Sequence, residues 1–180
     1  PSDGGPVAVP SQDMVLGIYY LTQERPGVKG EGMIFRNVNE AILAYENQEA
    51  TLHSRVKVRV SKTMPDGTVK TGIIESTIGR FIFNEIIPQD LGFVDRSIPG
   101  NELKLEVDFH VAKKQLKQIL EKVINVRGAT QTAVTLDDIK AIGYKYSTKA
   151  AMTVSISDMT VPASKPRLIG EAQATVDRIA

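Results

Sequence analysis

The sequence contains no cysteine, no tryptophan and only two histidines among its 180 residues. The absence of cysteine excludes disulfides, zinc–thiolate sites, iron–sulfur clusters and thiol nucleophiles. His53 and His110 lie far apart in the chain and outside any HExxH motif, so a histidine-based metal site has little to build on. No apolar run approaches the roughly 18 residues of a membrane span, and no secretory leader opens the chain. We therefore expect a cytoplasmic protein without a membrane partner.

Charge of one sign is also lacking, because 22 basic residues face 21 acidic ones. A free-standing nucleic-acid binder usually carries a strong basic excess, so this balance argues against one. The 42% hydrophobic and 24% charged residues suffice to bury a core and make disordered or collagen-like chains unlikely candidates. The start at Pro1 and a final apolar periodicity typical of a helix that is just beginning predict a piece of a longer protein.

The first fifty residues contain two helix patterns separated by a loop. Ser11 is placed to cap a short helix, with Asp13 in its first turn and an apolar face running to Leu21. Glycines at 27, 30 and 32 mark the loop. Their spacing is the reverse of a dinucleotide-binding fingerprint, so we interpret them as loop residues and not as a phosphate cradle. Residues 39–48 then predict a short surface helix.

A β-hairpin with a basic outer face follows. Valines alternate with Lys57 and Arg59 along residues 52–60, which predicts a strand with one buried and one basic face. The turn-forming residues 64–68 return the chain through a second strand at 69–74.

The second half of the chain is predominantly helical in pattern. Residues 80–87 favour a short helix, and the proline- and glycine-rich residues 89–100 predict a loop. Apolar residues between 116 and 124 recur at helical spacing, and Gly128 is placed to end that helix.

Two further elements are predicted beyond Gly128. Thr135, with Asp138 three residues on, forms a plausible capping box for a new helix that runs to Gly143. Residues 152–156 alternate as a strand does. The predicted fold class is α+β: a small sheet with a basic hairpin plus several amphipathic helices, forming an irregular fragment of a larger subunit.

The residue chemistry by itself leaves the function open. Asp137 and Asp138 could form a magnesium-binding pair, although a helix start explains them more simply. A small hydrolase that uses carboxylates is one alternative, and the lack of a coherent set of nucleophile, base and acid argues against it. A nucleic-acid-binding module is one alternative, because clustered cations displace counterions from nucleic acid. A solvated protein surface explains the same cations more simply. The phosphate-facing cations of such a module would be Arg55, Lys57, Arg59, Lys113 and Lys114.

Five segments, in order, resemble the β′ subunit of bacterial DNA-directed RNA polymerase and together span nearly the whole chain. They lie just downstream of that family's magnesium-binding aspartate loop. The segments are VPSQDMVLG (9–17) with YYLT (19–22), KGEGM (29–33), LHSRVKV (52–58), TIGR (77–80) with FNEIIP (83–88), and LDDIKAIGYKY (136–146) running into SISDM (155–159).

The resemblance implies a division of the chain. Residues 1–25 would end the catalytic double-psi barrel, and 26–169 would form the pore domain that lines the secondary channel. Residues 147–159 would be its F-loop, which supports the bridge helix and trigger loop, and 170–180 would open the first rim helix. By the same resemblance Gln12 would lie near the active centre. The residues implied in the F-loop and channel are Ser147, Thr148, Lys149, Thr153, Ser155, Asp158 and Met159.

Two departures concern the F-loop. Ala151 stands where the family has glycine and Ser157 where it has aspartate, which puts the backbone conformation and local charge in question because alanine resists positive φ.

The resemblance also implies what this chain lacks. Two-metal phosphoryl transfer in the family uses magnesium held by the NADFDGD aspartates, and that motif is absent from these residues. We therefore expect no catalysis, cofactor or metal in the fragment itself, and Mg²⁺ in the whole enzyme, bound outside this chain. Implied partners are the rest of β′, the β subunit and other polymerase subunits, the DNA template, the RNA 3′ end, nucleoside triphosphates, and secondary-channel regulators near the rim helix. The implied location is the nucleoid.

Overall fold

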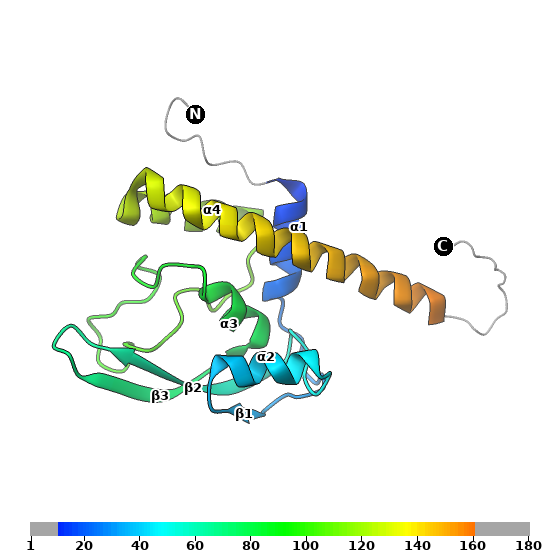
Figure 1. The fold of residues 1–180 in the computed structure, drawn as a ribbon, viewed down its shortest axis with the longest axis horizontal. Helices are drawn as coiled ribbons and strands as arrows, with labels where there is room; N and C mark the ends of the chain where they lie inside the picture. The colour runs from blue at the N-terminus through cyan, green and yellow to red at the C-terminus, as the bar shows by residue number, and fades with distance from the viewer. Residues whose placement is uncertain (1–10, 161–180) are drawn as a thin grey trace.

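A computed structural model describes the backbone of residues 11–160 and the side chains up to Met152. Helices form one side of the molecule and a small sheet the other (Figure 1). This arrangement confirms the predicted α+β class. The elements are α1 (Gln12–Thr22), β1 (Ile34–Phe35), α2 (Val38–Glu46), β2 (Arg55–Thr63), β3 (Val69–Thr77), α3 (Ile78–Asn84) and α4 (Lys113–Thr160).

The sheet has the order β1-β2-β3 and contains the predicted hairpin. β2 and β3 pair antiparallel with Val58 opposite Ile74, and β1 adds in parallel with Phe35 opposite Val58. The turn closes through a 2.7 Å bond from the Met64 amide to the Thr68 carbonyl. Gly67 has φ 89° there, a conformation that favours glycine. Val56 and Val58 of β2 are buried while Lys57 and Arg59 are exposed, as the alternation predicts.

Side-chain caps fix the starts of three helices. The Ser11 hydroxyl accepts the Met14 amide at 3.2 Å and confirms the predicted start of α1. Asn37 caps α2 in the same way, close to the predicted surface helix at 39–48. Thr77 caps α3, which covers 78–84, so the helix favoured at 80–87 exists but begins and ends earlier.

α4 consists of two helices joined at Gly128, where φ is 83° and ψ is 175°. The predicted helix end at Gly128 is therefore confirmed. A new helix starts immediately afterwards, and the Thr132 hydroxyl bonds to the Gly128 carbonyl at 2.7 Å in its first turn. Both halves of α4 reach the same core, through Ile119 from the first half and Ile139 from the second.

Three predictions for this region are wrong. Thr135 is buried inside a helical turn and does not cap a helix, because the helix had already started after Gly128. Gly143 does not end that helix, since its missing side chain accommodates a neighbouring helix instead. Residues 152–156 are helical and do not form a strand; their polar and apolar alternation is overridden by continuation of α4.

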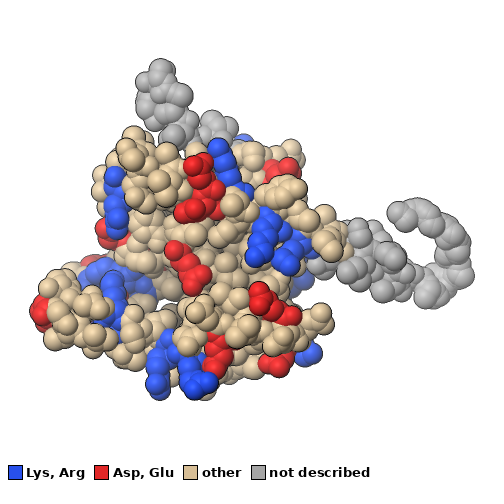
Figure 2. Space-filling view, viewed as in Figure 1, with Lys and Arg blue, Asp and Glu red and all other residues tan. Residues whose placement is uncertain are grey.

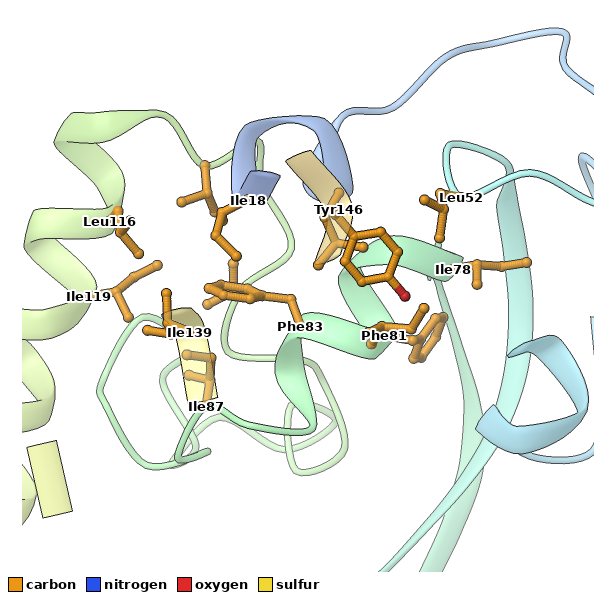
Figure 3. Packing of buried hydrophobic residues seen from close by; sticks show 14 of the residues in the cluster. Ile18, Leu52, Ile78, Phe81, Phe83, Ile87, Leu116, Ile119, Ile139 and Tyr146 are labelled. Atoms are coloured by element: carbon orange, nitrogen blue, oxygen red, sulfur yellow. The ribbon is translucent and has the colours of Figure 1, made fainter. Parts of the chain in front are cut away.

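The core lies between the helices and the sheet. α1 and α3 contribute Ile18, Phe81 and Phe83, which meet Leu116 of α4 and Leu52 ahead of β2 (Figure 3). Burying such aliphatic and aromatic side chains is the main stabilising term of the fold. The packing ties segments from the beginning, middle and end of the chain into one body.

Candidate functional site

Gln12 is the first residue of α1, directly after the Ser11 cap. Its side chain is exposed, and it lies two residues before Met14, whose side chain is buried. The cap and the buried methionine therefore fix the start of this helix and hold Gln12 at the surface.

α1 and α4 meet through two glycines. A Cβ atom on Gly17 would overlap the Gly143 carbonyl oxygen, and a Cβ on Gly143 would lie 2.9 Å from the Met14 Cα. Only residues without a side chain permit backbones to approach so closely. The crossing packs the helix that begins at Gln12 against the helix that carries the IGYKY segment, although the two are far apart in the sequence.

Beyond the crossing, α4 carries three of the predicted channel residues with described side chains. The hydroxyls of Ser147 and Thr148 bond to the Tyr144 carbonyl at 3.1 and 3.0 Å, so both engage the helix backbone. Lys149 is half-buried. The two tyrosines differ, because Tyr146 is 4% exposed and Tyr144 is 70% exposed.

The remaining predicted channel residues continue the same helix. Their backbone is helical through residue 160, so 147–159 is not an irregular loop in this structure. The side chains of Thr153, Ser155, Asp158 and Met159 lie outside the described residues, as do residues 1–10 and 161–180 with the expected rim helix.

Arg55, predicted as a phosphate-facing cation, is instead surrounded by carboxylates. Its guanidinium lies 3.1 Å from Glu24, 3.2 Å from Glu75 and 3.6 Å from Asp108. Partial burial disfavours the charged form, and the three carboxylates, led by Asp108, outweigh it and raise the pKa of Arg55. Arg55 therefore acts as a structural cation at the end of the sheet.

Arg80 completes this cluster from α3. Its side chain is only 6% exposed, bonds to the Thr22 carbonyl at 3.0 Å, and lies 3.3 Å from both Glu24 and Asp108. Asp108 also accepts a 2.6 Å bond from Ser76. Two arginines and three carboxylates thus join the end of α1, the hairpin, α3 and the loop before α4.

The other four predicted cations are exposed. Lys57 and Arg59 lie on β2, and Lys113 and Lys114 open α4. None of the four forms an ion pair with the described part of the chain. The two pairs belong to separate elements, the sheet and the start of α4.

A second buried charge holds the long loop between α3 and α4. Glu106 is 1% exposed, accepts the Phe93 amide at 2.9 Å and pairs with Arg96 at 3.1 Å. Arg96 also donates to four carbonyls of the same loop, including that of Lys104 at 2.6 Å. Sequence reasoning missed both residues, because the segment has only the proline and glycine signals of a loop.

His53 is buried where α1 ends and the chain enters β2. Its Nδ1 lies 2.9 Å from the Gln23 carbonyl, Tyr20 meets the ring edge-on, and Nε2 has no partner among the described residues. Burial is the main cause that lowers the pKa of His53, and Arg25 adds to it. The imidazole is therefore neutral near pH 7 and donates from Nδ1.

The described residues contain neither a metal-binding cluster nor a membrane-spanning helix. Among residues 11–152, no three histidine or carboxylate side chains come together as a metal-binding group, and Asp137 and Asp138 are exposed in mid-helix. No helix in the described part of the chain is both long and apolar enough to cross a membrane.

Comparison with known proteins identifies the family. Residues 1–159 match the family described as RNA polymerase Rpb1, domain 3. The chain belongs to this family, which agrees with the resemblance noted in its sequence.

Relatives place this domain in a bacterial subunit. The chain is 68% identical over its full length to the DNA-directed RNA polymerase subunit beta' of Lachnoclostridium phytofermentans and covers 14% of that protein. It is 56% identical to the same subunit of Acetivibrio thermocellus and 58% identical to that of Clostridium acetobutylicum, over 99% of the chain and 15% of each relative. The sequence thus corresponds to about one seventh of a β′ subunit.

Proposed function

We propose that the chain forms part of the wall of the secondary channel of a bacterial RNA polymerase. Nucleoside triphosphates would enter and backtracked RNA would leave along this wall during DNA-templated RNA synthesis. The observation that carries the proposal is the Gly17–Gly143 crossing in a chain of this family. It joins the segment attributed to the catalytic barrel to the segment attributed to the channel.

The proposal keeps the division implied by the resemblance. Residues 1–25 end the barrel, 26–169 form the pore domain, and 170–180 begin the rim helix approached by channel regulators. Residues 147–159 act as the F-loop and support the bridge helix and trigger loop. The helical backbone of α4 up to residue 160 supports the F-loop role, because a helix is stiff enough to support a neighbouring element that moves.

Electrostatics supply the chain's own contribution to substrate handling. Cations along a low-dielectric channel attract triphosphates and raise their local concentration. Lys149, six residues beyond Gly143 on α4, is the central cation in this role, with Lys113 and Lys114 at the start of α4. Gln12 at the start of α1 would lie nearest the active centre.

Nucleotidyl transfer belongs to the whole polymerase in this proposal. The magnesium that such enzymes use would be held by aspartates outside this chain, and the chain alone has no activity. Its partners are the remainder of β′, the β subunit, template DNA and the RNA 3′ end, in the nucleoid.

The test replaces Lys149 with glutamine in a polymerase assembled around a β′ subunit that contains this chain. We expect the KM for nucleoside triphosphates to rise about threefold at low ionic strength, with kcat little changed and the difference reduced by salt. Lys140→Gln, an exposed cation earlier on α4, is the matched control.

The outcomes separate the two levels of the proposal. An unchanged KM in an active Lys149→Gln polymerase contradicts the assigned role of this lysine. If a β′ subunit that contains this chain does not assemble into a polymerase, the assignment of the chain to the polymerase is contradicted.

A further inference from the structure

The outer face of the sheet has no element packed on it within the described residues. Strand register and burial place the aliphatic and charged side chains of Ile34, Lys57, Arg59, Val69, Ile73 and Glu75 there, together with the exposed hydroxyl residues Ser61, Thr63 and Thr71. We call this set the outer sheet face. The intervening residues, including Phe35, Val56 and Val58, are buried toward the helices. Figure 1 shows the helices on one side of the strands only.

Aliphatic side chains are unusually exposed on this face. Ile34 and Val69 are each 65% exposed and Ile73 is 52% exposed, and they come from the two edge strands. The cations Lys57 and Arg59 lie on the central strand, with Ile34 and Ile73 directly opposite them in register. Basic side chains also project from the lower part of the molecule, where the strands lie (Figure 2).

The charges of the outer sheet face are not compensated within the described chain. Its carboxylate, Glu75, is bound to Arg55, whereas Lys57 and Arg59 make no ion pair there. On the inner side of the hairpin, by contrast, Lys70 pairs with Glu102 at 3.2 Å and Lys62 donates to the Glu102 carbonyl at 3.4 Å. The two outer cations are therefore available to acidic groups of another molecule.

We propose that the outer sheet face binds a separate protein through an acidic segment in which carboxylates alternate with aliphatic residues. The carboxylates would pair with Lys57 and Arg59, and the aliphatic side chains would cover Ile34 and Ile73. This inference goes beyond the channel-wall function and does not depend on it.

The composition of the face favours protein over nucleic acid. Single-stranded nucleic acid is held by aromatic stacking together with a run of cations. The outward positions of the three strands carry no aromatic ring, and Glu75 would oppose phosphates. Exposed isoleucines gain only from a partner with apolar groups of its own.

The same composition favours a reversible partner over permanent cover by the rest of a larger subunit. Lysine is almost never fully buried unless it is paired, and permanent interfaces are more apolar than transient ones. A surface of mixed aliphatic and charged groups is typical of partners that bind and dissociate.

The experiment titrates the folded 180-residue chain, labelled for amide NMR, with a synthetic peptide in which glutamate and valine alternate. Shifts are expected on β1, β2 and β3. In Lys57→Glu/Arg59→Glu the affinity should fall at least about tenfold, because attraction becomes repulsion. Lys113→Glu/Lys114→Glu removes two exposed cations from α4 and should bind as the parent does. Ile73→Ser should weaken binding without changing the charge.

Three results would overturn the proposal. One is equal binding by the two charge-reversed variants. Another is equal binding of a peptide that alternates glutamate with serine, because the aliphatic side chains would then contribute nothing and charge attraction alone would explain binding. The third is binding of a single-stranded oligonucleotide through Lys57 and Arg59 in place of the peptide.

A second measurement addresses permanent cover. Acetylation of Lys57 is measured in an assembled polymerase that contains this chain, with Lys140 as the exposed reference. Reactivity matching that in the isolated chain supports a surface open to a separate protein. Loss of reactivity confined to Lys57 would mean that the same enzyme already covers the face and would overturn the proposal.

Discussion

Besides the shared hydrophobic core, two contacts of the molecule depend on different forces: the α1–α4 crossing and the junction at the end of the sheet. α1 and α4 approach backbone to backbone at Gly17 and Gly143, and aliphatic side chains fill the space around that contact. The sheet is joined to the helices at one end by two arginines and three carboxylates. Close backbone packing tolerates almost no added side-chain volume. The strength of ion pairs, in contrast, depends on salt and on the presence of both partners.

The largest expected effect comes from adding one methyl group on the helical side. Gly17→Ala would gain about 1 kcal/mol of helix propensity, but its Cβ would overlap the Gly143 carbonyl, at a cost of about 3 kcal/mol or more. We therefore expect a net loss of stability, measured as a lower urea midpoint. Leu16→Ala, at the exposed neighbour, should change stability by only about 0.5 kcal/mol. A Gly17→Ala protein more stable than the parent would contradict the close crossing.

A smaller effect is expected on the charged side, and it should differ between the two arginines. Arg80→Met takes one donor from Glu24 and Asp108, which keep Arg55 as a partner, and leaves the buried Thr22 carbonyl without its arginine, so we expect a loss of about 2 kcal/mol. Arg55 is 29% exposed, so Arg55→Met should cost about 1 kcal/mol and lose part of that difference in high salt. Arg36→Met, in a pair exposed to solvent, is the control and should be nearly neutral. Equal losses for all three variants would mean that burial does not set the strength of these pairs.

The smallest effect concerns pH at the junction of the two sides. Because the pKa of His53 is lowered in the folded protein, the unfolded chain takes up a proton first as pH falls below the ordinary value of 6.5. Stability contributed by neutral His53 is therefore complete above that value and decreases below it. His53→Gln should flatten the slope of unfolding free energy as the pH falls below about 6.5. A slope unchanged by the substitution would show that His53 is not the titrating group.

Local chemistry predicted much of the fold. Ser11 caps α1 and the residues around Gly67 form the hairpin turn because those residue types satisfy backbone groups within a few positions. Gly128 ends a helix for the same local reason. Gly143 has the same composition signal and sits inside a helix, because α1, more than a hundred residues earlier in the sequence, needs the space that its side chain would fill.

The candidate site was less predictable than the fold. Arg55, Lys57 and Arg59 form one alternating pattern in the sequence, yet only Arg55 is neutralised. Its partners Glu24 and Asp108 come from distant loops, and a single sequence without its fold does not show which carboxylate reaches which cation. The resemblance supplied family membership, and the order of five motifs sufficed for that.

The crossing of α1 and α4 has a mechanical consequence. Most helix pairs touch through side chains, which can change rotamer and absorb a small displacement. Here the Gly17 backbone is in direct contact with the Gly143 backbone, with no side chain between them. A tilt of the far end of α4 would therefore displace α1 by nearly the full amount. A displacement of α4 near residue 160 would therefore also move the start of α1 at Gln12.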